Sequence, residues 1–110
     1  MVNIKKTYRE ISPDLLYAEV MDFSLKQGLK LGINRQETYT LPDHSADFIL
    51  RGTLTFTLDN KECLRVHIVG TAREETKLMM DVDETIFPAD KLAALQADLD
   101  FIFSSKEEDE

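Results

Sequence analysis

Residues 47–72 read DFILRGTLTFTLDNKECLRVHIVGTA, and this stretch decides the fold. Apolar and polar residues alternate with a period of two on both sides of Asp59–Glu62, which supplies a turn. One face carries the apolar residues Phe48, Leu50, Leu54, Phe56, Leu58, Leu64, Val66 and Ile68. The other face carries Thr53, Thr55, Thr57, Cys63, Arg65 and His67. The pattern predicts an antiparallel hairpin with one covered face and one polar face.

The C-terminal segment 89–103 is the best cover for the apolar face of this hairpin. Its apolar residues recur at helical spacing: Leu92, Leu95, Leu99 and Ile102. Pro88 stands where a helix can begin. The following residues 104–110, SSKEEDE, are expected to form an acidic disordered tail, with docking to a basic partner as an alternative role.

Residues 13–27 allow two interpretations. Ser12, Pro13 and Asp14 are typical of a helix start, with a cap, a proline and an acid in order. From Met21 to Ile33, however, apolar residues alternate with polar ones, which is a strand period. We expect at most one helical turn near 13–16, followed by strands over about 17–40 with a break near Gly28.

Together these segments predict a single α+β domain over residues 1–103. The expected architecture is an antiparallel sheet of about four strands with the C-terminal amphipathic helix packed on one face. Residues 2–11 could add a short first strand. A chain of 110 residues is long enough to bury one core without disulfides.

Net charge, apolar runs and cysteine content limit the classes of partner and the compartment that we expect for this protein. The net charge is −8, from 13 basic and 21 acidic residues, which argues against nucleic acid and anionic membranes as partners. No apolar stretch is long enough to insert into a membrane. A single cysteine, Cys63, cannot form an internal disulfide and fits a reducing cytoplasm, where we expect it to be a structural thiol.

The acidic stretch Asp81-Val82-Asp83-Glu84-Thr85 resembles the first motif of the haloacid-dehalogenase-like phosphatases, in which two aspartates act beside magnesium. Phosphoryl transfer needs further metal ligands and a cation for the phosphate. Only 25 residues follow Thr85, and they read as one helix and a tail. A calcium loop would need a glycine within it. The favoured interpretation is a solvated acidic loop in a protein without catalytic residues, cofactors or bound metal.

The histidines give no metal site either. His44 and His67 lack a cysteine or second histidine at ligand spacing. The expected role of His67, which shares a face with Arg65, is that of a surface or interface residue.

The run LKLGINRQETYTLPDHSADFILRGTLTFTLDNKECLRVHIVGTA, residues 29–72, resembles the SecB export-chaperone family and its shorter relatives. The later IFPADKL, residues 86–92, is similar to the place where that family enters its helix. The resemblance implies a four-stranded sheet with helix on one side, assembly into dimers or tetramers, and ATP-independent holding of extended polypeptides. The acidic residues after the hairpin depart from the family, as does the lack of its basic, SecA-directed ending.

Two sets of residues are candidates for function under this resemblance. An adaptable apolar surface for polypeptide would use Met79, Met80, Ile86 and Phe87, with ordinary core packing as the alternative. Subunit contacts would use Thr53, Thr55, Thr57, Arg65 and His67 on the polar hairpin face. The competing function is a protein-interaction or scaffold domain, and the partner in either case is a polypeptide.

Overall fold

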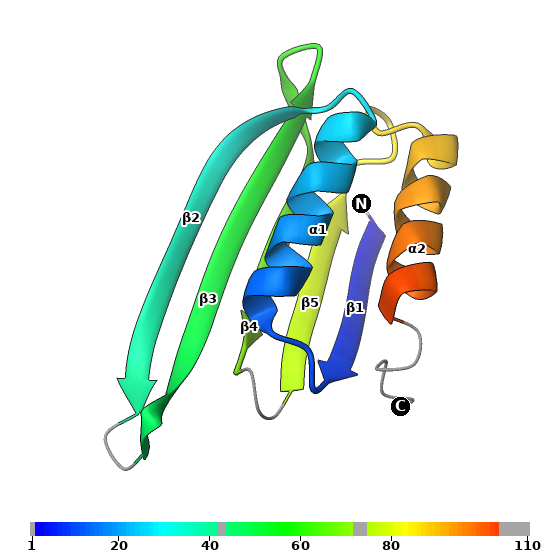
Figure 1. The fold of residues 1–110 in the computed structure, drawn as a ribbon. Helices are drawn as coiled ribbons and strands as arrows, with labels where there is room; N and C mark the ends of the chain where they lie inside the picture. The colour runs from blue at the N-terminus through cyan, green and yellow to red at the C-terminus, as the bar shows by residue number, and fades with distance from the viewer. Residues whose placement is uncertain (1, 42–43, 72–74, 104–110) are drawn as a thin grey trace.

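The structure is a computed structural model that describes residues 2–41, 44–71 and 75–103. The elements in chain order are β1 (Val2–Arg9), α1 (Pro13–Lys26), β2 (Lys30–Leu41), β3 (His44–Leu58), β4 (Lys61–Gly70), β5 (Glu75–Val82) and α2 (Ala89–Phe103). The strands form one sheet in the order β1-β5-β4-β3-β2, and every neighbouring pair is antiparallel. Both helices lie on the same face of this sheet (Figure 1). The predicted α+β class and antiparallel sheet are confirmed.

The expected number of about four strands is wrong, because the described residues form a sheet of five. The fifth is β5, which lies between β1 and β4 and was not predicted as a strand of its own. Thr76, Leu78, Met80 and Val82 are buried, whereas Lys77 and Met79 between them are exposed. This period of two is typical of a strand with one covered face. The alternation is hidden in the sequence because Met79, on the exposed face, is apolar like its buried neighbours Leu78 and Met80.

The hairpin predicted at residues 47–72 forms as β3 and β4, joined by a two-residue turn. Asp59 and Asn60 have φ angles of 54° and 66°, the left-handed values that a type I′ turn requires. The register shifts between Phe56 and Thr57, so that Cys63 is an extra residue on β4. Cys63 is therefore buried, and the prediction that it lies on the polar face is wrong. Its thiol donates a hydrogen bond to the Phe56 carbonyl oxygen at 3.6 Å.

The expectation of one helical turn near 13–16 followed by strand is wrong, because α1 continues for 14 residues. Its buried residues are Pro13, Leu16, Tyr17, Val20 and Ser24, which follow the helical period. The apolar alternation that began at Met21 was coincidental, since Leu25 is 43% exposed. The predicted break is confirmed: Gly28, with φ of 89°, follows the helix and turns the chain into β2.

The predicted C-terminal helix is confirmed with the bounds Ala89–Phe103. Leu95 and Leu99 are buried, as expected from their spacing, but Ile102 is 43% exposed and Phe103 is buried in its place. Phe103 packs edge-on against Tyr8 of β1, with ring centroids 5.7 Å apart. The helix thus covers the β1 side of the sheet, and the tail 104–110 lies outside the described residues.

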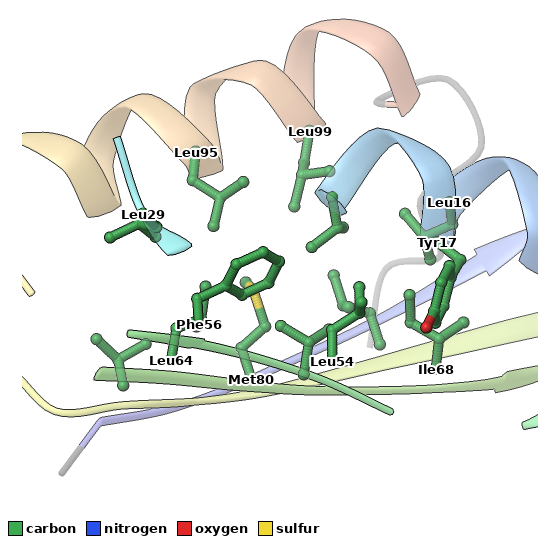
Figure 2. Packing of buried hydrophobic residues seen from close by; sticks show 14 of the residues in the cluster. Leu16, Tyr17, Leu29, Leu54, Phe56, Leu64, Ile68, Met80, Leu95 and Leu99 are labelled. Atoms are coloured by element: carbon green, nitrogen blue, oxygen red, sulfur yellow. The ribbon is translucent and has the colours of Figure 1, made fainter. Parts of the chain in front are cut away.

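One core fills the space between the helices and the sheet. Figure 2 shows Leu95 and Leu99 of α2 pointing toward Phe56, Leu54 and Met80 on the strands. All five side chains are at most 1% exposed. Because both helices use the same face, the opposite face, here called the open face, is covered by neither helix (Figure 1). No helix within the described part of the chain is long and apolar enough to span a membrane.

Candidate functional site: the β2 edge and the open face

The outer edge of β2 is the first surface that no other described element covers. This strand pairs with β3 on one side and ends the sheet on the other. From Asn34 to Thr40 its register with β3 runs without interruption. Side chains 32–39 are all exposed, including the apolar Ile33 (41%) and Tyr39 (46%). The strand therefore presents a row of outward backbone donors and acceptors together with apolar side chains.

Helix α1 holds β2 in place through Tyr17. The Tyr17 hydroxyl donates a hydrogen bond to Asn34 Oδ1, and it lies 3.5 Å from the carbonyl oxygens of Arg35 and Thr53. Burial raises the pKa of Tyr17, and the hydrogen bond to the Arg35 backbone opposes that rise. One phenol thus links a helix to two strands at the start of the regular part of β2.

The other support of β2 is a bulge between Leu31 and Asn34. Here the Ile33 backbone N–H donates to Thr55 Oγ1 at 2.7 Å. A Cβ atom on Gly32 would lie 2.6 Å from the same oxygen, so the close approach requires glycine. Thr55 is only 3% exposed as a result.

The open face is the second uncovered surface, and the strand register arranges it in cross-strand rows. One row runs Lys5, Met79, His67, Thr53, Arg35 from β1 to β2. The next runs Thr7, Lys77, Val69, Arg51, Glu37. Thr53 Oγ1 and His67 Nδ1 lie 3.3 Å apart within the first row. Most side chains of the two rows are polar or charged, and each row contains one apolar residue, Met79 in the first and Val69 in the second.

The structure places the predicted subunit-contact residues mainly on this open face. Thr53, Arg65 and His67 are half-buried there, and Arg65 pairs with Glu62 at 3.1 Å. Thr57 stands at the bulge opposite Glu62. Thr55 has the position that the alternation predicted, but the β2 bulge encloses it, so its side chain is not available to a partner.

The predicted polypeptide-binding residues Met79, Met80, Ile86 and Phe87 do not form one surface. Met80 and Phe87 are buried in the core, at 0% and 2% exposure, which is the packing alternative. Ile86 is partly buried against the same core. Met79 points the other way, onto the open face, and is 38% exposed. The period of two along β5 puts Met80 and Met79 on opposite faces, so only Met80 of this pair enters the core.

The acidic motif is divided between two settings. Asp81 is on β5 opposite Asn3 and Arg65. Asp83 lies just after the strand, where its carboxylate accepts from the Thr85 hydroxyl at 2.6 Å and the Thr85 N–H at 3.0 Å. These two hydrogen bonds lower the pKa of Asp83. Strand β5 is antiparallel to both neighbours, unlike the doubly wound sheet on which the phosphatase motif acts.

Within residues 2–41, 44–71 and 75–103, no three His, Cys, Asp or Glu side chains are grouped to hold a metal ion. The Cys63 thiol is buried, and this burial raises its pKa. The side chain of His44 lies outside the described residues.

Sequence reasoning predicted β2 as a strand but did not single it out as a functional edge. The available signal was the run RQETYT, residues 35–40, which has strand-compatible residues without an apolar face. Such a run is typical of a strand whose faces are not covered by other elements of the protein. The missing information was the strand order, which decides whether a polar strand is central or at the edge.

Comparison with known proteins gives no relative from which a role could be transferred: no family model, curated protein or solved structure matches this chain.

Proposed function

We propose that this protein binds extended polypeptide segments without catalysis, by accepting them as an added strand along the outer edge of β2. In this proposal it is a SecB-like, holdase-type protein that acts as a homo-oligomer in the cytoplasm. The observation that supports it best is the regular, uncovered edge from Asn34 to Thr40.

Backbone pairing explains how such an edge can serve many clients. An added strand gains main-chain hydrogen bonds whatever its sequence, and alternate side-chain contacts then set preference. Ile33 and Tyr39 offer apolar contact toward either end of the edge. Proteins usually block such edges with prolines, charged side chains, bulges or covering segments. Strand β2 has no proline between residues 30 and 41, and its bulge lies between Leu31 and Asn34, before the regular edge begins.

A pair of adjacent proline substitutions tests the edge directly. Successive residues of a strand point their N–H groups to opposite sides, so one of Gln36→Pro and Glu37→Pro removes a bond to β3 and the other removes only an outward donor. The variant that loses only the outward donor should have nearly the melting temperature of the parent protein, so thermal melting identifies which of the two it is. That variant should lose peptide binding in fluorescence anisotropy.

The matched control is Thr7→Pro or Lys6→Pro, whichever melts closer to the parent, because β1 is the opposite edge of the same sheet. Unchanged peptide binding by the folded β2 variant would contradict the proposal. So would an equal loss in the folded β1 variant, because the binding edge would then not be β2.

Holdase action is tested with a reduced, unfolding client followed by light scattering. The protein should slow aggregation at near-stoichiometric amounts without ATP, and the folded β2 proline variant should not. Analytical ultracentrifugation tests assembly, and a strict monomer at high concentration would contradict the oligomeric part of the proposal. No effect on aggregation at several-fold excess would contradict holdase action.

A further inference from the structure

The charges of this acidic protein are separated between its two layers. By register, the part of the open face whose side chains are described carries seven basic residues: Lys5, Arg9, Lys30, Arg35, Arg51, Arg65 and Lys77. It carries four acids there: Glu37, Glu62, Glu75 and Asp81. The two helices carry the reverse balance, with the six acids Asp14, Glu19, Asp22, Asp90, Asp98 and Asp100 against the two lysines Lys26 and Lys91. The open face is therefore cationic on a chain whose net charge is −8.

We infer that the open face selects acidic polypeptide segments, so that the extended chains bound at β2 are those whose residues toward this face are Glu or Asp. This inference rests on the proposed function and names the client class. A strand added to β2 extends the sheet, so every second side chain projects on the open-face side. The nearest cations are then Arg35 on β2 and Arg51 on β3, and both are exposed.

The apolar residues of the face fit a peptide better than a nucleic acid. Val69 and Met79 lie between the cations, beside Lys77 and His67 in the two central rows. Single-stranded nucleic acids bind on aromatic platforms, and Tyr39 is the only aromatic side chain among the described open-face residues. The interspersed acids Glu37 and Asp81 also oppose a continuous phosphate backbone.

A second copy of the chain is a poorer occupant of this face. A two-fold interface places the same patch against itself, so the excess of cations would meet an equal excess. Like charges brought together across an interface cost binding energy. The proposed assembly would therefore use another surface, and the open face would remain for the client.

Three labelled peptides of equal length test the inference, with valine alternating with glutamate, serine or lysine. Their binding is measured by fluorescence anisotropy at about 50 mM and about 300 mM salt, where screening differs. The glutamate peptide should bind at least about tenfold more tightly than the serine peptide at low salt, a difference that corresponds to about 1.4 kcal/mol. Its advantage should shrink at high salt.

The variant Arg51→Glu/Lys77→Glu should lose this preference and still bind the serine peptide. The matched control Lys26→Glu/Lys61→Glu changes the net charge equally, at exposed positions off the open face, and should keep the preference. Arg51→Gln/Lys77→Gln keeps long side chains without charge, and its preference for the glutamate peptide should lie between those of the parent protein and the charge-reversed variant. Thermal melts confirm that all variants fold.

The possible failures are distinguishable. If none of the three peptides binds the parent protein, the proposed function is wrong. If all three bind equally, or both charge-reversed variants change alike, polypeptide binding stands and the selectivity is wrong. If single-stranded oligothymidine binds the parent protein more tightly than the glutamate peptide does, and Arg51→Glu/Lys77→Glu loses that binding, the inference is overturned in favour of nucleic acid.

Discussion

The hydroxyl of Tyr17 on α1 donates its hydrogen bond to the Asn34 side chain on β2, 17 residues away. This bond fixes the covered face of the edge strand to the helix layer just where its regular pairing with β3 begins. The opposite edge of the sheet is held differently, by the packing of α2 on β1. The outer strand is thereby kept straight and paired on one side while its outer edge stays open.

Tyr17→Phe should therefore loosen β2 more than the rest of the sheet. The change removes one hydroxyl and leaves the Asn34 amide short of a partner, so we expect a loss of about 1–2 kcal/mol in the free energy of unfolding. Hydrogen exchange should accelerate in β2 and hardly change in β5. The control is Tyr39→Phe, whose hydroxyl donates to Glu37 on the same exposed strand. Uniform acceleration across all strands would contradict a local role for Tyr17.

Thr55→Val should destabilise the β2 bulge at nearly constant volume. The Ile33 N–H would lose its acceptor, Thr55 Oγ1, and the loss of this part-buried hydrogen bond should cost about 1 kcal/mol. Chemical denaturation measures the loss, and Thr38→Val, an exposed position on β2, serves as the control. If both variants unfold at the same denaturant concentration, the hydrogen bond does not support the bulge.

Gly52→Ala should strain the contact between β3 and α1. An added Cβ would lie 2.5 Å from two ring carbons of Tyr17, so we expect a cost of about 1–3 kcal/mol from overpacking. The same substitution in a Tyr17→Leu background should cost much less, because the ring is gone. A double-mutant cycle of unfolding free energies measures this coupling, and additive effects would show that the clash lies elsewhere.

Stability should fall with rising pH through the carboxyl pair Glu19 and Asp98, which joins α1 to α2. The hydrogen bond to Asp98 and burial raise the pKa of Glu19 from 4.5 to about 7, with the nearby charge of Asp22 adding to the rise and Lys26 opposing it. The folded protein then keeps a proton between these values that the unfolded chain has lost. This contribution is complete below the unfolded pKa and disappears as pH rises through about 7.

Glu19→Gln is the matching variant, since the amide can still donate to Asp98 but does not titrate. Melting temperatures compared between about pH 5 and pH 8 should fall less in this variant than in the parent protein, and the variant should be the more stable one at pH 8. Asp14→Gln, which removes an exposed α1 carboxylate, controls for net charge. A parallel pH dependence in parent and Glu19→Gln would contradict the shared proton.

Local sequence patterns predicted the helices and strands in which buried residues recur with a regular period. The hairpin of β3 and β4 and the helix from Ala89 to Phe103 were predicted from such patterns. The turn was predicted over Asp59–Glu62, and the structure limits it to Asp59 and Asn60. Residues 17–26 were misassigned because Met21, Phe23 and Leu25 happen to alternate while the burial follows Leu16, Tyr17 and Val20. Strand β5 was missed because its exposed face carries the apolar Met79, so Leu78–Met80 reads as an apolar run without alternation.

The candidate site was predicted only in part. Thr53, Arg65 and His67 were correctly placed on the polar face of the hairpin. Thr55 shared their pattern, yet the bulge at Gly32 and Ile33 buried it. Met80 and Phe87 were candidates because methionine and phenylalanine suit a binding surface, but the core uses the same residue types. Residue type alone does not separate these two uses.

The sequence by itself determined the α+β class, the hairpin, the covering helix and a total charge of −8. Only the tertiary structure decided the strand order, which made β2 an edge, and the packing of both helices on one face, which separated acidic helices from a cationic sheet. The physical reason is that periodicity and composition are local sums along the chain. Which strand lies outermost, and which charges share a surface, depends on contacts between residues far apart in the chain.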